Sequence, residues 1–183
     1  MAKLLFTFLF LATSSLWAMP AQILLMRHGE KPTVGNQLSP QGWRRAQALP
    51  TLFIRPELRR FGLPVALYAM APSHPGGSVR AIQTLSITSK TLNEPINTQF
   101  TKDSVAQLLM QIKSNPSFNG KFLVICWEHT VLLEIARQLG LPNPPDWPDT
   151  QFDRMWKMNF SSQGQLIGFQ NLPERLLPTD NLK

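Results

Sequence analysis

The stretch Q-I-L-L-M-R-H-G at Gln22–Gly29 changes abruptly from apolar to polar residues. A short apolar run of this kind is typical of a strand that is buried on both faces inside a parallel sheet. Two further runs of similar length lie at Val65–Met70 and Lys121–Cys126, and K-F-L-V-I-C in the second is the strongest strand signal in the chain. These three segments predict the central strands of one sheet, and Ile96–Phe100 predicts a weaker fourth strand.

Segments with helical spacing of apolar residues separate these strands. They begin at Pro40 and Ser78 and cover Ser104–Lys113 and Thr130–Leu139. We expect Ser78 to be the N-cap of a helix through about Lys90, and Gly140 to end the last helix. The helix after Ser78 is expected to bury Val79, Ile82 and Leu85. The alternation of strand and helix predicts an α/β fold, a three-layer sandwich with a mostly parallel central sheet and helices on both faces.

The end of the chain has a different pattern. A proline-rich stretch at 142–148 encloses Trp147 and precedes two strand-like segments, Met155–Phe160 and Gln165–Phe169. Ser161–Gly164 reads as the turn between them, so we expect a C-terminal hairpin near a sheet edge. Trp147 is interpreted as a packing anchor, with one wall of a binding site as the alternative.

Residues 1–18 differ from the rest of the chain. Lys3 provides a positive start, Leu4–Thr13 is an apolar run, and small residues including Ala18 precede Met19. This layout predicts a secretory signal peptide at 1–18 and a single domain at 19–183 that is exported to a periplasm or secreted. The alternative is an uncleaved anchor, although the run is short for a bilayer span. No stable membrane span is expected after cleavage.

The composition is that of an ordinary globular protein with a positive surface. Hydrophobic residues make up 43% of the 183, charged residues 16%, and the formal net charge is +7. Such a field attracts anions, among them phosphorylated small molecules. The basic residues are scattered singly or in pairs, as at Arg44–Arg45, which does not match a nucleic-acid-binding pattern. We therefore expect no nucleic-acid partner. The single Cys126 excludes an intrachain disulfide.

Three polar motifs follow predicted strands or begin predicted helices. They are Arg27–His28–Gly29, Ser78–Val79–Arg80 and Glu128–His129. In open α/β sheets, ligands bind beyond the carboxyl ends of the strands. We therefore expect these segments to bring four side chains to one edge of the sheet, namely Arg27, His28, Arg80 and His129.

These residue types suit phosphoryl transfer. A neutral imidazole is a nucleophile near pH 7 when a hydrogen bond holds its other nitrogen. Guanidinium groups match phosphoryl oxygens in pairs and neutralise their charge. A second, protonated histidine can add charge, and so can the positive end of the helix near Thr130. Because arginines can do this work, we expect no metal and no cofactor, and the sequence contains no recognisable metal-ligand spacing.

The motifs resemble those of the histidine phosphatase superfamily, which includes phosphoglycerate mutases and many phosphatases. L-L-M-R-H-G-E followed by L-S-P-Q-G-W-R-R-A resembles the opening of that family, S-V-R-A-I-Q-T its second arginine motif, and W-E-H the segment of its second histidine. The resemblance covers about Ile23 to Leu139. It implies that His28 becomes phosphorylated, that Arg27 and Arg80 clamp the phosphate, and that His129 stabilises the transferring group.

The sequence departs from the family pattern where many members carry a general acid. The region after Arg80 lacks the family's Glu-containing motif. The candidates that remain are Glu30, Glu94, Asp103 and Glu128. Lys31 stands where mutases often have a small hydroxyl residue, and the long insertions that cover the mutase site are absent. These departures favour a phosphatase with an open cleft over a mutase.

The sequence thus predicts a metal-independent phosphomonoester hydrolase that acts through a phosphohistidine on His28. Its expected substrate is a phosphorylated small molecule or a phosphoprotein. Two alternatives keep the same fold. One is a non-catalytic module that binds phosphate or phosphoprotein, and the other is a phosphotransferase of the phosphoglycerate mutase type.

Overall fold

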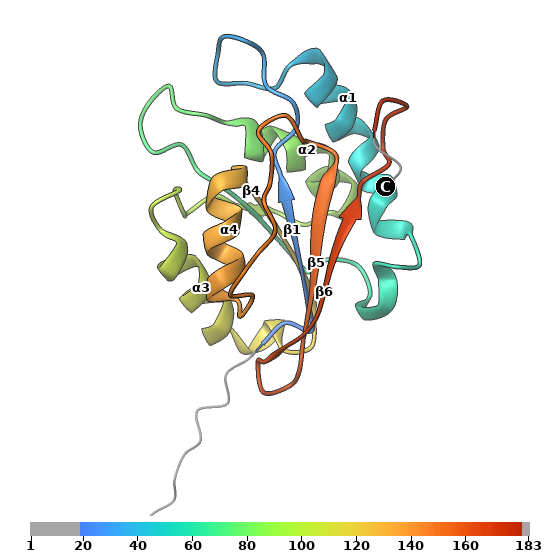
Figure 1. The fold of residues 1–183 in the computed structure, drawn as a ribbon, viewed down its shortest axis with the longest axis vertical. Helices are drawn as coiled ribbons and strands as arrows, with labels where there is room; N and C mark the ends of the chain where they lie inside the picture. The colour runs from blue at the N-terminus through green and yellow to red at the C-terminus, as the bar shows by residue number, and fades with distance from the viewer. Residues whose placement is uncertain (1–18, 181–183) are drawn as a thin grey trace, which may run out of the picture.

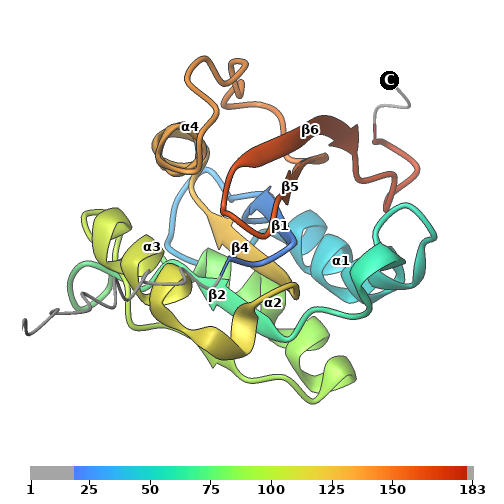
Figure 2. The ribbon, with the colours of Figure 1, turned by 90° about the horizontal axis from the view of Figure 1, so that it is seen from below.

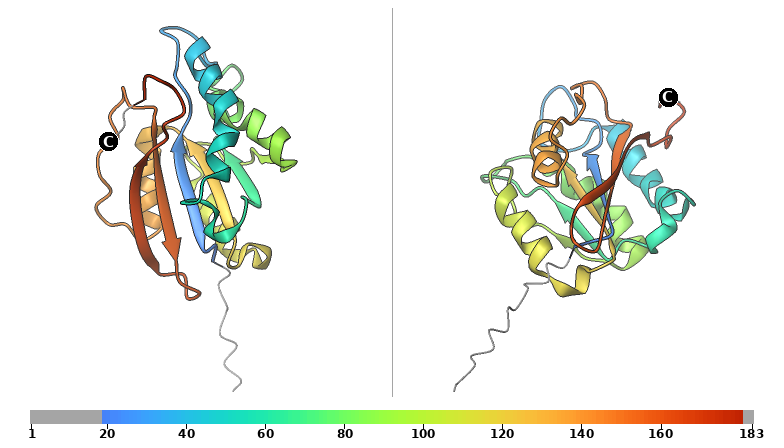
Figure 3. Two further views of the ribbon diagram at one scale, coloured as in Figure 1. Left: turned by 90° about the vertical axis from the view of Figure 1, so that its right-hand side faces the viewer. Right: turned by 60° about the horizontal axis from the view of Figure 1, so that its bottom comes forward.

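A six-stranded sheet forms the centre of the computed structural model, which describes residues 19–180 (Figure 1). The strands are β1 (Gln22–Arg27), β2 (Ala66–Ala69), β3 (Ile96–Asn97), β4 (Phe122–Trp127), β5 (Arg154–Phe160) and β6 (Leu166–Pro173). Their order is β3-β2-β4-β1-β5-β6. The first four are parallel, and β5 and β6 form an antiparallel hairpin beside β1, coloured orange to red in Figure 3. The predicted sheet and edge hairpin are therefore confirmed.

Helices cover both faces of this sheet, as predicted. They are α1 (Pro40–Ala48), α2 (Arg80–Leu92), α3 (Val105–Ser114) and α4 (His129–Gln138), with short 3-10 turns η1 (Leu49–Ile54), η2 (Arg59–Phe61) and η3 (Pro116–Phe118). α1 packs against α2, and α3 packs against α4. Figure 2 shows these two pairs on opposite sides of the sheet.

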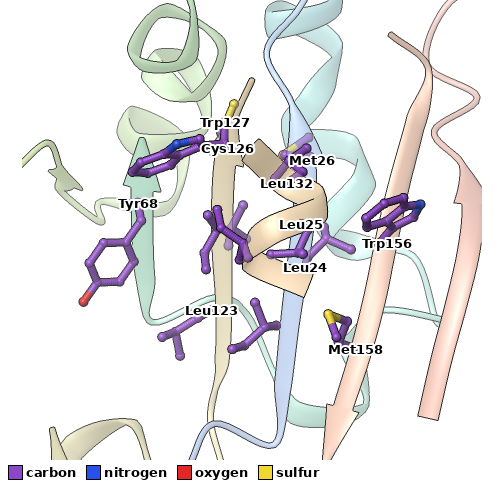
Figure 4. Close-up of a cluster of buried hydrophobic side chains, with 14 of the residues drawn as sticks. Leu24, Leu25, Met26, Tyr68, Leu123, Cys126, Trp127, Leu132, Trp156 and Met158 are labelled. Atoms are coloured by element: carbon purple, nitrogen blue, oxygen red, sulfur yellow. The ribbon is translucent and has the colours of Figure 1, made fainter. Parts of the chain in front are cut away.

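The hydrophobic core is continuous across the described residues. Every residue of β1 and β4 is buried, because each strand lies between two others in the sheet and helices cover both faces of the sheet. Leu132 of α4 lies over these strands, and Trp156 and Met158 extend the core to β5 (Figure 4). Burial of this much apolar surface is the main force that holds the layers together.

The predicted beginning of α2 is wrong by one position. The helix begins at Arg80 with Val79 as its N-cap, and the Val79 side chain makes no capping hydrogen bond. Ser78 instead accepts a hydrogen bond from Arg80 Nη1 at 3.3 Å. The buried stripe consists of Ala81, Thr84, Leu85 and Thr88. Of the residues expected inside, Val79 and Ile82 are only partly buried. A small alanine and two threonines, of which Thr84 donates to Arg80 O, made this stripe hard to recognise.

The other helices agree better with the sequence. α3 buries Val105, Leu108, Leu109 and Ile112, as the spacing indicates. Gly140 follows α4 with a φ of +98°, and Leu141 N–H donates to Ala136 O, which ends the helix as expected. Among residues 19–180 no helix is long and apolar enough to cross a membrane. The signal peptide predicted at 1–18 lies outside the described residues.

Candidate active site

The carboxyl ends of β1 and β4 bring the two predicted histidine motifs together. The strands pair in register, with Arg27 opposite Trp127. His28 N–H continues the ladder by donating to Trp127 O at 3.0 Å. His129 is the first residue of α4, two positions after β4 ends. The site therefore forms where parallel strands end, as the fold predicts.

His28 has the geometry of a nitrogen nucleophile. Its Nδ1 lies 2.7 Å from Gly29 O, and because a carbonyl only accepts, Nδ1 carries the proton. The lone pair is then on Nε2. The side chain is 5% exposed, and burial lowers the pKa of His28 to about 4, with the charges of Arg27, Arg80 and Lys31 adding to the shift. The ring is therefore neutral at pH 7.

A close approach of two glycines fixes the backbone after His28. Gly29 N–H donates to Thr84 Oγ1 at 2.9 Å, and the same hydroxyl donates to Arg80 O. A Cβ at Gly29 would come within 3.1 Å of Gly42 O, and a Cβ at Gly42 would come within 2.5 Å of Glu30 O. The positioning role of Thr84 was not assigned from the sequence, although the helix that carries it belongs to the second arginine motif.

Arg27 is enclosed by the segment that follows α4. This segment, 141–153, returns to the carboxyl end of β1, where β5 begins (orange in Figure 1). The Nη1 group of Arg27 donates to the carbonyls of Pro148, Asp149 and Gln151 at 2.7–3.2 Å. Phe152 stacks on the guanidinium at 3.9 Å. The Arg27 side chain is 1% exposed, and among residues 19–180 its Nε has no hydrogen-bond partner.

The carboxylate of Asp149 lies close to three cationic or imidazole side chains of the site. Two of them, Arg27 and His129, were expected there from the motifs, and the third is Lys31. Asp149 Oδ1 is 2.9 Å from Arg27 Nη2, 3.1 Å from Lys31 Nζ and 3.7 Å from His129 Nε2. The hydrogen bond from Lys31 is the largest cause that lowers the pKa of Asp149, and Arg27 adds to it. The sequence did not single out Asp149, because a loop without periodicity gives no sign of where it folds back. Lys31 could have been inferred from its place directly after R-H-G-E.

His129 differs from the expected protonated state. Burial, followed by the charge of Arg27, lowers its pKa, and the attraction of Asp149 is too weak to reverse the shift. His129 is therefore neutral at pH 7 in the free protein. A phosphoryl dianion in place of the Asp149 carboxylate would favour the protonated form, because an opposite charge close by raises the pKa of a histidine.

Arg80 is near the site, but its donors are used elsewhere. It donates to the carbonyls of Gly35 and Gln37 and to Ser78 Oγ. Its positive charge contributes to the lowered pKa of His28. The structure thus gives Arg80 an electrostatic influence on the nucleophile, with its guanidinium held by the loop before α1.

Glu30 is bound to a structural arginine. Arg45 Nη2 lies 2.6 Å from Glu30 Oε1, and Gln41 also donates to this carboxylate. Arg45 also binds Glu174 and Asp180. The carboxylate of the first candidate acid is therefore held by Arg45 and Gln41.

The three other candidate acids come from three different segments of the chain. Glu94 precedes β3 and so lies at the amino end of the parallel strands, opposite the site. Asp103 is exposed in the turn before α3. Glu128 precedes His129, and its side chain makes no capping hydrogen bond to α4. In the described part of the chain, no three His, Cys, Asp or Glu side chains gather as a metal-binding group.

A cavity of about 470 Å³ lies beside this centre, not in it. Its lining includes Glu30, Arg45, Phe152 and Asp180 but none of Arg27, His28 and His129. The reason is that residues 148–152 cover Arg27. Trp147, which follows the proline-rich stretch, is buried against Trp156 with ring centroids 4.7 Å apart, so it is a packing anchor.

Solved structures of other proteins have a similar fold. No family model matches the sequence, and no curated protein is significantly similar to it. Among solved structures, the protein histidine phosphatase SixA complexed with tungstate has a TM-score of 0.58 at 14% identity, covering 84% of this chain and 97% of that one. A phosphoglycerate mutase from Plasmodium falciparum has a TM-score of 0.57 at 12% identity, covering 88% and 96%. The chain therefore shares the fold of these two solved structures, which is the fold that the resemblance of its motifs implies.

Proposed function

We propose that the protein is a phosphatase that hydrolyses phosphomonoesters through a phosphohistidine intermediate on His28, without a metal ion. The observation that carries this proposal is the state of His28. Its Nδ1 is held by Gly29 O, and its low pKa keeps the ring neutral, which leaves the lone pair on Nε2. A buried histidine that serves only as packing needs neither a fixed tautomer nor cationic neighbours.

The reaction has two steps. The Nε2 lone pair of His28 attacks phosphorus, the P–N bond forms, and the leaving oxygen departs with the electron pair of the broken P–O bond. Water then attacks the phosphohistidine, the P–N electron pair returns to Nε2, and the water proton passes to phosphate or solvent. Arg27 and Arg80 offset the charge on the phosphoryl oxygens, and His129 stabilises the transferring group in its protonated form.

The position of the carboxylates favours substrates with good leaving groups. Glu30 is bound to Arg45, Glu94 lies at the opposite end of the strands, and the pKa of Asp149 is lowered. A leaving group that departs without a proton suits such a site. Aryl phosphates, acyl phosphates and phosphohistidine fit this description. Because SixA is described as a protein histidine phosphatase, we propose a phosphoprotein as one candidate substrate besides small molecules.

The decisive test is turnover of aryl phosphates by the mature protein in the presence of a metal chelator. We expect His28→Ala to lower turnover by at least about 10³-fold, the scale of losing a covalent catalyst. His74→Ala is the matched control, because His74 is exposed and its ring is hydrogen-bonded only to Pro75 O among the described residues. Activity of His28→Ala within tenfold of wild type, or activity that returns only with added divalent metal, would falsify the proposal.

The same assay separates the two alternatives. A binding module would bind phosphate without turnover. A mutase would transfer the phosphoryl group to a second acceptor molecule. A labelled phosphoryl group would then not appear as inorganic phosphate.

The site of action is a separate proposal. We infer export from the n-region, apolar run and small residues of 1–18. The expected result is an intact mass that corresponds to a chain beginning at or near Met19 when the protein is recovered from the producing cell. A full-length chain in the cytosol contradicts export. The mutase alternative would then regain support, because a mutase needs a substrate that is found inside the cell.

A further inference from the structure

The Asp149 carboxylate takes the donors that a phosphoryl group needs. Arg27 Nη2 and Lys31 Nζ bind it at 2.9 and 3.1 Å, and His129 Nε2 is 3.7 Å away. These groups come from the end of β1 and the start of α4. Two of them belong to the set that the motifs assign to phosphate. A carboxylate of the chain itself thus lies among the phosphate-binding donors.

The Asp149 carboxylate can leave these donors without unfolding of the loop. The Asp149 side chain is 59% exposed, whereas the Arg27 side chain that it binds is 1% exposed. The loop backbone around it is anchored, because Trp147 is buried against Trp156 and its Nε1 donates to Gln151 O at 3.0 Å. Asp149 can therefore swing into solvent by side-chain rotation, while the loop keeps its place over Arg27.

A phosphoryl dianion is a better partner for these donors than the carboxylate. It carries about two negative charges in place of one, and three terminal oxygens in place of two. The buried Nε–H of Arg27, without a partner among residues 19–180, is a further donor on the same guanidinium. A monoanion has no such advantage over Asp149, since it brings the same charge and no more acceptors than the group that it must displace.

We propose that Asp149 is an internal competitor in the phosphoryl subsite and that Lys31 is a phosphate-binding residue of that subsite. The inference rests on the proposed function and deepens it, because it restricts the substrates to terminal, dianionic phosphoryl groups. Phosphodiesters and carboxylates are excluded by competition with Asp149, and the side chain returns to the cations when phosphate leaves.

The test measures binding of inorganic phosphate by calorimetry at constant ionic strength, so that it does not depend on turnover. We expect Asp149→Asn to tighten phosphate binding about tenfold. This is the gain expected if Asp149 occupies the subsite in about nine of ten molecules of the wild-type protein and the variant leaves it open. Asp146→Asn is the matched control, because Asp146 is exposed in the same loop, and its phosphate affinity should stay within about twofold of wild type.

Lys31 is tested in both backgrounds. In wild type, Lys31→Ala removes a ligand of phosphate and a partner of Asp149 together, so the two effects offset each other. In the Asp149→Asn background only the phosphate contact remains, and binding should weaken about tenfold. This non-additivity is the signature of a shared site.

Each result is decisive. Unchanged or weaker phosphate binding by both Asp149→Asn and Asp149→Ala overturns the inference. Selective loss of alkyl phosphate turnover in Asp149→Asn also overturns it, because Asp149 is then the proton donor. If the wild-type protein hydrolyses no phosphate ester but Asp149→Asn binds phosphate more tightly, the proposed function fails and the internal competitor stands.

Discussion

Two arginines of this protein are almost completely buried, and each faces carboxylates, but the two clusters have different carboxylate partners. Arg45 binds Glu30, Glu174 and Asp180, all of them mostly or completely buried. Arg27 binds one carboxylate, that of Asp149, which is mostly exposed. A buried arginine with buried partners is fixed, whereas a buried arginine with one solvent-exposed partner can exchange it for a ligand.

The Arg45 cluster joins distant parts of the chain. Arg45 lies on α1, Glu30 follows β1, and Glu174 and Asp180 follow β6. Leu176 and Leu177 donate backbone hydrogen bonds to Asp180. Burial alone would raise the pKa of Asp180, but the hydrogen bonds from Arg45 and from this backbone lower it. The cluster thus fastens the C-terminal segment to the side of the active site.

The largest expected effect on stability comes from breaking the fixed cluster. Arg45→Met leaves buried carboxylates without their cation, which typically costs about 3–5 kcal/mol of unfolding free energy. Arg27→Met should cost about 1–2 kcal/mol, because its partners are loop carbonyls that water can reach, yet it should abolish phosphatase activity. Chemical denaturation and aryl phosphate turnover of both variants check the contrast. Equal loss of stability in the two variants contradicts the division between a fixed and an exchangeable arginine.

The sequence predicted one of these clusters far better than the other. Arg27 and His28 stand at the end of an apolar run, so the periodicity of the chain reveals where they lie. Arg45 has no such marker, since a charged residue on an amphipathic helix is expected to face water. Its partners Glu174 and Asp180 are 129 and 135 residues away in the sequence.

Asp149 escaped prediction for a related reason. The four parallel strands and the hairpin follow from local patterns, but the path of 141–153 depends on tertiary contacts of Trp147 and Phe152. The family resemblance drew attention to the region after Arg80, where many members carry a general acid, and not to 141–153. Side chains on irregular loops are placed by packing partners that no local period reveals.

An intermediate effect is expected from the proton on Glu174. Burial raises the pKa of Glu174 to about 8, and Asp180 and Glu30 add to the shift against the pull of Arg45. The folded state keeps this proton up to about pH 8, whereas the unfolded chain releases it near its ordinary pKa of 4.5. The folded state therefore binds more protons between these values, and stability falls as the pH rises through this window.

Glu174→Gln removes that dependence. We expect wild type to lose on the order of 2 kcal/mol more than the variant between pH 5 and pH 8, measured as unfolding free energy at several pH values. Subtracting the variant from wild type cancels the titration of the histidines. A difference that stays constant across this range means that Glu174 is ionised in the folded protein, and that the fixed cluster holds three negative charges.

The smallest effect is expected from Glu30, which stands between the two clusters. Its backbone follows Gly29 at the active site, but its carboxylate is bound to Arg45 and Gln41. Glu30→Gln should therefore lower stability by about 1 kcal/mol, because glutamine still offers one oxygen to Arg45. It should change aryl phosphate turnover by less than about threefold, because the group takes no part in proton transfer.

Turnover of aryl and alkyl phosphates by Glu30→Gln, measured side by side, distinguishes a structural Glu30 from a general acid. A general acid contributes about 10² to 10⁴ in rate where the leaving group is a poor alkoxide, and little where it is a good one. If Glu30→Gln selectively abolishes alkyl phosphate turnover, the carboxylate leaves Arg45 during catalysis. The Arg45 cluster would then be the one that exchanges a partner, and sugar phosphates would become suitable substrates. Wild-type turnover of aryl phosphates at least about 10²-fold faster than alkyl phosphates is the result that agrees with Glu30 bound to Arg45.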